Sequence, residues 1–298
     1  MTKITSYLSV LFSVLLLISC KNGSYDLKFN PPAGAKYKYV VVMNQEMQQS
    51  MKGQEHNVDN TTEMYVTYEI LQNTGADKHL KLTYNRFKGS SNGTAYDTDD
   101  SSAANGNNPM TFVYNGMKNY PLLITISEKG QVKDVTGIDE LLDRVVGSIP
   151  LDSARKAMIR TTTEKIMGKD FVKSMIEQSF KIFPSSKVSV GDTWKDSMML
   201  TAGLDFKMAN SFTLKGVDNN KATIDVSSDI TSGAMDMGMM KIETNMKGTQ
   251  KGTTELDLPT GMTTSSDLDQ QIEGNMKIMG MEIPVKIKTK IKVTGTKI

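Results

Sequence analysis

The sequence predicts an α+β protein that is mostly antiparallel β, in which long curved strands form a half-barrel or barrel-like sheet. A central insert of three helices is expected to pack on the apolar face of this sheet. Three observations support the prediction: long runs of alternating apolar and polar residues near both ends of the chain, one apolar face in each run, and a helical pattern in the middle. An antiparallel sheet that is covered on one side produces such one-sided alternation.

The N-terminal β region begins with a long alternating run. Its apolar face comprises residues of one parity: Tyr37, Tyr39, Val41, Met43, Met47 and Met51. A second run, with Met64 and Val66, turns at residues 73–75 and returns with Leu80 and Leu82, which predicts a hairpin. Strands of roughly 12–16 residues would extend ~40–50 Å, whereas ~5–6 residues are usual. We therefore expect a wide, curved sheet, followed by an exposed loop over the Ser-, Gly-, Asn- and Asp-rich residues 90–108.

The middle of the chain predicts three helices between the two β regions. The first covers residues 139–146 and ends before Pro150. Asp152 is the expected N-cap of a second helix over residues 153–167, which Gly168 ends. Asp170 is the expected N-cap of a third helix over residues 171–182. The apolar stripe of this third helix predicts that it packs against the sheet.

The C-terminal β region has the clearest alternation. Ile283, Val285, Ile287 and Ile291 share one face, and the opposite face comprises Lys286, Lys288, Lys290 and Lys292. The expected domain organisation follows from these patterns. A signal peptide covers residues 1–19, a lipidated tether covers 20–30, and a single β-rich domain covers 31–298. Two β halves, 31–136 and 184–298, flank the helical segment 137–183 in that domain.

Cys20 is the only cysteine in the chain, and it directly follows the apolar residues 8–18 and Ser19. With the basic Lys3 before the apolar run, this segment resembles the signal and lipobox of bacterial lipoproteins, in which the cysteine is acylated. As a helix the apolar run would extend only ~16 Å, too short for a hydrocarbon core of ~30 Å. We therefore expect a membrane anchor through lipidated Cys20. No aspartate follows Cys20 in Lys21-Asn22, which favours the outer membrane and leaves the periplasmic or surface orientation open.

Composition argues against several function classes. The formal net charge is +2 at pH 7, from 35 basic and 33 acidic side chains, so nothing indicates a nucleic-acid partner. The two histidines, His56 and His79, accompany no Gly-x-Ser-x-Gly nucleophile elbow and no metal-ligand spacing. We expect no catalytic residues, no metal and no cofactor, and hence no enzyme.

The segment Gly191-Asp192-Thr193-Trp194 resembles a motif of β-rich lipoproteins from Gram-negative bacteria, a group with no established activity to transfer. More distantly, the expected architecture resembles LolA/LolB and mycobacterial lipid-carrier half-barrels. That resemblance implies helices plugging a concave sheet, with acyl chains bound between them. Asp152-Ser153-Ala154 and Asp196-Ser197-Met198 resemble an O-glycosylation sequon, and the sequence leaves their glycosylation open.

The chain contains 22 methionines, many of them on the apolar faces of the expected strands. Methionine adapts to irregular apolar shapes and recurs on promiscuous binding surfaces. We expect a groove between sheet and helices that binds a lipid-like or other hydrophobic ligand, with a candidate lining of Met43, Met47, Met64, Met208, Met235 and Met237. The alternative is a solid core in a structural or interaction lipoprotein, whose lysine stripe or loop 90–108 contacts another envelope component. Ligand identity and oligomeric state remain open at this level.

Overall fold

The computed structural model describes residues 23–51, 53–100, 109–201, 205–233, 235–236, 241–278 and 280–298. The first strands are β1 (Lys36–Met51), β2 (Gln54–Thr74), β3 (Asp77–Ser91), β4 (Thr94–Asp97), β5 (Pro121–Ser127) and β6 (Val132–Thr136). The later strands are β7 (Thr193–Thr201), β8 (Asp205–Asp218), β9 (Lys221–Ser232), β10 (Met235–Asp236), β11 (Lys241–Asp257), β12 (Thr263–Ile278) and β13 (Met281–Lys297). The helices are α1 (Pro109–Met117), α2 (Ile138–Ser148), α3 (Ser153–Met167) and α4 (Lys169–Phe180).

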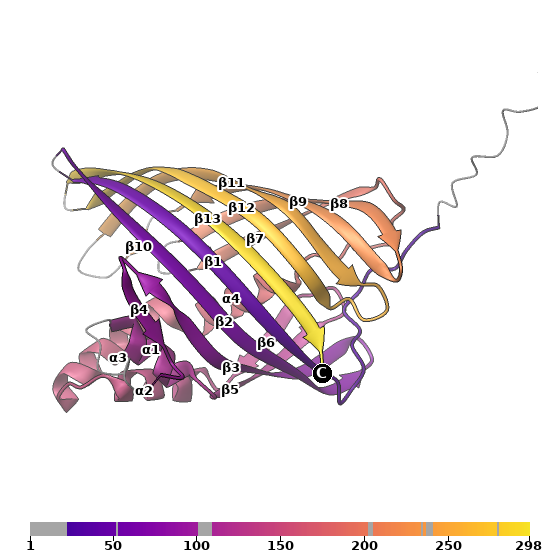
Figure 1. Cartoon of the computed structure of the whole chain (residues 1–298), viewed down its shortest axis with the longest axis horizontal. Helices are drawn as coiled ribbons and strands as arrows, with labels where there is room; N and C mark the ends of the chain where they lie inside the picture. Colours follow the sequence, from indigo (N-terminus) through magenta and orange to yellow (C-terminus); the bar gives the residue numbers. More distant parts are fainter. Residues whose placement is uncertain are drawn as a thin grey trace, which may run out of the picture.

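The strands of the described residues form one antiparallel sheet in the order β6-β5-β3-β2-β1-β13-β12-β11-β9-β8-β7, with β4 on β3 and β10 on β11. Pairing of β1 with β13 joins the N-terminal strands to the C-terminal ones, from Tyr37↔Lys297 to Gln49↔Val285. The sheet is long and strongly curved, but β6 and β7 remain unpaired edges (Figure 1). The predicted fold class, a mostly antiparallel α+β half-barrel, is confirmed.

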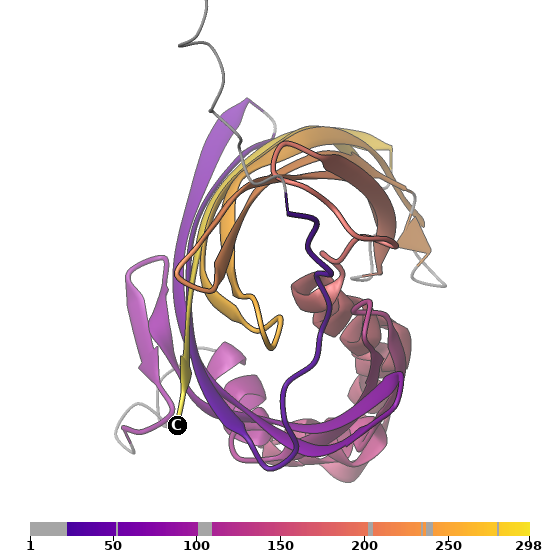
Figure 2. The same ribbon diagram turned by 90° about the vertical axis from the view of Figure 1, so that its right-hand side faces the viewer.

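Curvature requires close contact between neighbouring strands on the concave, inner face. A Cβ atom on Gly252 of β11 would lie 2.0 Å from the carbonyl oxygen of Asp267 on β12. Only glycine fits this approach, as is typical where strands bend sharply. The curl brings the two edges near each other, and α4 lies in the gap between them, in contact with β6 and β7 (Figure 2).

The inner face is apolar and the outer face is charged. The first cluster of buried apolar residues includes Tyr39, Val66 and Leu214 and lies between the sheet and the helices. The second cluster lies further along the long strands and consists of Met198, Met208, Ile230, Met246, Ile272, Ile283 and Val285. On the outer face, Lys286 pairs with Glu273 at 3.7 Å and Lys292 with Asp267 at 3.4 Å.

The three predicted helices are present, and they differ in what they cover. Asp152 caps α3 as expected, because its side chain accepts a hydrogen bond from the backbone N–H of Arg155 at 2.9 Å. Helix α4 begins at Lys169, two residues before the predicted start at residue 171. Asp170 therefore lies in its first turn rather than at the N-cap. Helix α4 covers the inner face, α2 packs on α1, and α3 lies outside them with mostly exposed residues.

Two expectations about connecting segments are corrected. Part of the predicted loop 90–108 is a hairpin, since β3 continues to Ser91 and β4 returns from Thr94; residues 101–108 lie outside the described residues. The structure also places residues 25–30 of the predicted tether 20–30 in contact with the fold. Leu27 and Phe29 are buried in the first cluster because apolar and polar residues alternate there as in a strand. Residues 25–30, called the N-terminal strap below, cross the open end of the curl (Figure 2).

Candidate functional site

An apolar cavity of about 300 Å³ lies between the inner face of the sheet and α4. Helix α4 contributes Met175, Ile176 and Phe180 to its wall. The sheet contributes aliphatic and aromatic side chains from strands on both sides of the β1–β13 pairing: Tyr39, Val41, Val66, Tyr68, Phe212, Val226, Leu268, Ile291 and Val293. Ligand sites of proteins typically have volumes of ~300–1,000 Å³ with mostly apolar walls, so this cavity has the size and character of a small one.

The structure separates the six methionines of the predicted lining. Met43, Met64 and Met208 line the cavity. Met47 packs instead against the second cluster. Met235 pairs with Ile242 in the β10–β11 ladder, where the side chains are not described, and Met237 lies outside the described residues.

Two further methionines of the wall, Met175 of α4 and Met198 of β7, were not among the predicted lining. Met175 belongs to the predicted apolar stripe of α4, and it lines the cavity while 42% of its surface stays exposed. Met198 gave no comparable signal, because its position in the wall depends on how far the sheet curls.

An aromatic group closes the cavity toward the N-terminal strap. The ring of Phe180 meets those of Phe29 and Tyr68 edge-on, at centroid distances of 5.1 and 5.5 Å. Tyr39 lies edge-on to Tyr68 at 5.4 Å and donates a hydrogen bond to the carbonyl oxygen of Thr263 at 2.9 Å. Burial raises the pKa of Tyr39 and Tyr68, and raises that of Tyr84 to about 12. These phenols therefore stay neutral, and the cavity wall keeps its apolar character.

Helix α4 is attached to both edges of the sheet. At its start, Lys169 forms an ion pair with Asp134 of β6 at 2.7 Å. Just after its end, the Lys181 ammonium donates to the carbonyl oxygen of Ser197 on β7 at 2.9 Å and pairs with Asp196 at 3.2 Å. Trp194 of β7 donates its indole N–H to the carbonyl oxygen of Ile182 at 2.9 Å. These contacts fix the helix over the cavity.

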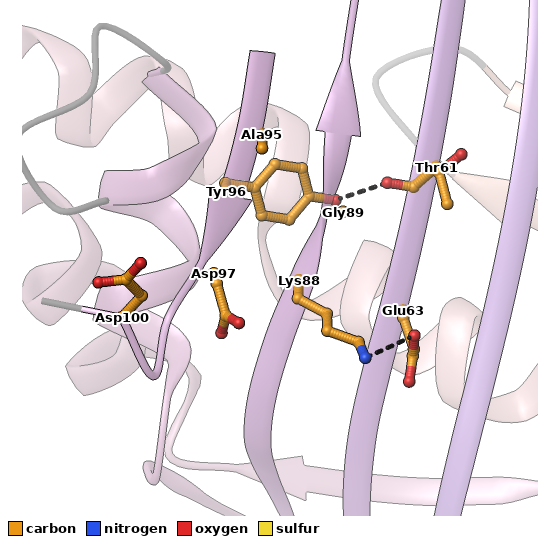
Figure 3. Close-up of a pocket in the computed structure, with 8 residues that line it drawn as sticks. All are labelled: Thr61, Glu63, Lys88, Gly89, Ala95, Tyr96, Asp97 and Asp100. Carbon is orange, nitrogen blue, oxygen red and sulfur yellow. Dashed lines mark hydrogen bonds and ion pairs between the residues drawn. The ribbon is translucent and has the colours of Figure 1, made fainter. Parts of the chain in front are cut away.

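A second depression, of about 380 Å³, lies on the surface over β2, β3 and β4 (Figure 3). Lys88 pairs with Glu63 at 3.0 Å, and the Tyr96 hydroxyl donates to the carbonyl oxygen of Thr61 at 3.2 Å. Asp97 accepts two hydrogen bonds from Arg86, which lower its pKa. The contacts of Tyr96 and Asp97 hold β4 against β2 and β3.

The other residues considered from the sequence lie apart from the cavity. His56 lies near the start of β2 and pairs with Gln49 of β1. His79 lies on β3 and pairs with Gln72, near the other end of β2. Within the described ranges, no group of three His, Cys, Asp or Glu side chains could hold a metal ion. Ser153 and Ser197, of the two sequon-like segments, are exposed. Cys20 lies outside the described residues.

The model of DUF6263, a family of unknown function, matches residues 75–263, more than half of the chain. The chain belongs to this family. The match begins in the turn before β3 and ends at the start of β12, so it includes all four helices and the two edge strands beside α4. No curated protein matches this DUF6263 chain.

Several solved structures are similar to this DUF6263 protein at low TM-scores. The COG4313 outer membrane channel from Pseudomonas putida F1 is 10% identical, with a TM-score of 0.25 over 91% of this chain and 98% of that one. Salmonella typhi OmpF in complex with daunomycin is 8% identical, with a TM-score of 0.23 over 88% and 98%. Acinetobacter baumannii OccAB4 is 6% identical, with a TM-score of 0.20 over 89% and 99%. Likenesses this distant support no conclusion about function. Of the helices in the part of the chain that the structure describes, none has the length and apolar character needed to cross a membrane.

Proposed function

We propose that this protein is a non-catalytic lipoprotein of the bacterial envelope, anchored through Cys20, that binds a lipid-like or other hydrophobic ligand in the cavity under α4. The observation that supports binding is the cavity itself. Its volume of about 300 Å³ and its mostly apolar wall are those of a small ligand site. Covering this wall with an apolar ligand would remove apolar surface from water, which is the main favourable term in such binding.

The composition of the wall supports an acyl or similar chain as the occupant. Flexible thioethers from Met43, Met64, Met175, Met198 and Met208 surround the space. Such side chains adjust to chains of different length and unsaturation. In the alternative function, a structural or interaction lipoprotein, methionine would only fill a solid core. The cavity favours the binding function over that alternative.

Photo-crosslinking of the purified full chain with a diazirine-bearing alkyl probe tests the proposal. We expect the probe to label peptides of α4 and of β8–β12, with the labelled fraction saturating as the probe concentration increases. Leu268→Trp places a larger side chain in the cavity from β12 and should strongly reduce this labelling. Asp269→Trp places the same side chain on the exposed outer face of the same strand and should leave labelling unchanged.

Two results would contradict the proposal. The first is labelling that does not saturate and that falls on residues of the outer face. The second is equal labelling of the Leu268→Trp and Asp269→Trp variants. Circular dichroism of both variants shows whether either substitution has disturbed the fold.

A further inference from the structure

A row of polar side chains crosses the inner face of the sheet. Residues directly opposite each other in antiparallel strands point to the same face, and the pairing aligns seven such residues from β8 to β2. This polar row consists of Asn210, Ser228, Gln250, Gln270, Thr289, Gln45 and Asn60. Every member has a hydroxyl or an amide, so each can both donate and accept a hydrogen bond.

Two hydroxyls in the polar row are buried without a partner. Ser228 is 2% exposed and Thr289 is 3% exposed. Among the residues that the structure describes, neither hydroxyl oxygen has a hydrogen-bond partner. Buried polar groups are nearly always hydrogen-bonded in folded proteins, so these groups require a partner that belongs to neither the backbone nor a neighbouring side chain. An ordered water molecule is one candidate, and a ligand is another.

The cavity meets the polar row near its β8 end, where two of the seven members line the wall. Asn210 and Gln250, which flank Ser228 on its two neighbouring strands, both line the cavity. On one side of the row the wall includes Phe212 of the first cluster, and on the other side it includes Met208 of the second cluster. The Phe212 side also includes Thr254 and Ser266, whose hydroxyls are hydrogen-bonded to each other at 2.8 Å. An occupant of the cavity would therefore meet side chains of both apolar clusters, with a short polar zone between them.

The polar row itself carries no charge, and the cation nearest to it is already paired. Lys181 lines the cavity, but its ammonium donates to the carbonyl oxygen of Ser197 at 2.9 Å and pairs with Asp196, the residue beside Asn210 on β7, at 3.2 Å. A ligand carboxylate or phosphate would have to compete with Asp196 for this cation, and burying such a charge unpaired is costly.

We propose that the ligand of this cavity is a neutral amphiphile whose hydrogen-bonding group, an ester, amide or hydroxyl, lies between two apolar segments and contacts Asn210, Ser228 and Gln250. This inference rests on the proposed function and defines the chemical class of its ligand. The hydroxyl of Ser228 and the amides beside it supply donors and acceptors to the polar group, and the two apolar clusters hold the chains on either side.

The test is competition against the alkyl photo-probe with the purified full chain. Three competitors of equal chain length are compared at equal mole fraction in the micelle: a hydrocarbon, a terminal carboxylate and a chain with an internal amide. We expect the amide to compete roughly tenfold better than the other two, the ratio expected for about one buried hydrogen bond. In Ser228→Ala and Gln250→Met that advantage should fall below about threefold. The controls are Ser227→Ala and Lys251→Met, at outer-face neighbours in the same strands. Both controls should retain the roughly tenfold advantage of the amide competitor.

Each outcome distinguishes the two proposals. Equal competition by all three compounds in the wild-type chain would overturn the neutral-amphiphile inference and leave the proposed function standing. Absence of cavity labelling by the photo-probe would overturn the proposed function itself. The urea midpoint of the ligand-free Ser228→Ala variant separates a ligand from a structural water. We expect it to equal or exceed that of the wild type, and a clear decrease would show that the hydroxyl serves the fold instead.

Discussion

Gly130 offers a quantitative test of how tightly α4 is fitted to the sheet. It lies in the turn between β5 and β6 with φ +81°, and a Cβ atom there would be 1.9 Å from the carbonyl oxygen of Phe180 at the end of α4. Side-chain Cβ atoms essentially never approach other heavy atoms within 3.0 Å, so Gly130→Ala requires a displacement of about 1.1 Å, the difference between 3.0 and 1.9 Å. Either the turn or the helix end must move.

Two energetic terms oppose Gly130→Ala. The positive φ costs an alanine about 1–2 kcal/mol. The displacement resembles the overpacking of a core, which adds about 1–3 kcal/mol. Gly75→Ala is the matched control, because Gly75 lies in the turn between β2 and β3 with φ +59° and has nothing within 4 Å of the added Cβ. It should cost only the first term.

The assay is urea or thermal unfolding of the full chain, monitored by circular dichroism. We expect Gly130→Ala to lower the free energy of unfolding by about 1–3 kcal/mol more than Gly75→Ala. Photo-probe labelling of α4 should also weaken in Gly130→Ala alone, because the helix end forms part of the cavity wall. Free energies of unfolding that agree within about 0.5 kcal/mol for the two variants would refute the contact as a restraint on α4.

Three other outcomes are expected. Phe180→Ala removes the ring between Phe29 and Tyr68 and should lower the free energy of unfolding by about 3–5 kcal/mol in urea titrations; a loss below about 1 kcal/mol would contradict the aromatic closure. Burial raises the pKa of Tyr84 to about 12 and also raises that of Tyr68, whereas tyrosines of an unfolded chain titrate near ~10. Above pH ~10 the unfolded chain therefore binds fewer protons than the native one. The free energy of unfolding should then fall as the pH is raised toward about 12, and it should fall less steeply in Tyr68→Phe. Equal free energies of unfolding from urea titrations at pH 8 and 11 would oppose this. Cys20→Ser should move the chain from the membrane fraction to the soluble fraction in cell fractionation, and unchanged membrane association would argue against acylation.

The alternation of apolar and polar residues was sufficient to predict most of the sheet. Burial on one face alone gives a strand a period of two. Strand β1, with Tyr39 and Met43, and strand β13, with Val285, show it along much of their length. The stripe of α4 likewise predicted that this helix covers the sheet.

Helix α1 was missed because its sequence, with Asn115-Gly116 near its end, resembles a turn. A Cβ on Gly116 would lie 2.6 Å from the Cα atom of Val145, so close packing against α2 requires a residue of poor helix propensity there. Local propensity gives no information about such a contact between helices that are distant in the sequence.

The cavity was only partly predictable, for a geometric reason. Met43 and Met47 share a strand face, but only Met43 lies where α4 leaves space. The polar row gave no sequence signal, because Asn210 and Gln250 are brought to either side of Ser228 only by the register of three strands. Register depends on hairpin lengths and bulges, such as the one between Leu214 and Gly216, which periodicity does not reveal.

The N-terminal strap contacts the fold only five residues after Cys20, which limits the distance between the β-rich domain and a bilayer that holds an acylated Cys20. Tyr25 is already hydrogen-bonded to Val188, with its N–H 2.7 Å from that residue's carbonyl oxygen. Five residues of extended chain reach ~18 Å at most, so acyl chains on Cys20 would keep the strapped end of the curl within about 18 Å of the lipid headgroups. A molecule leaving that end would cross at most about 18 Å of water, roughly two Debye lengths at physiological salt, before it reached the membrane.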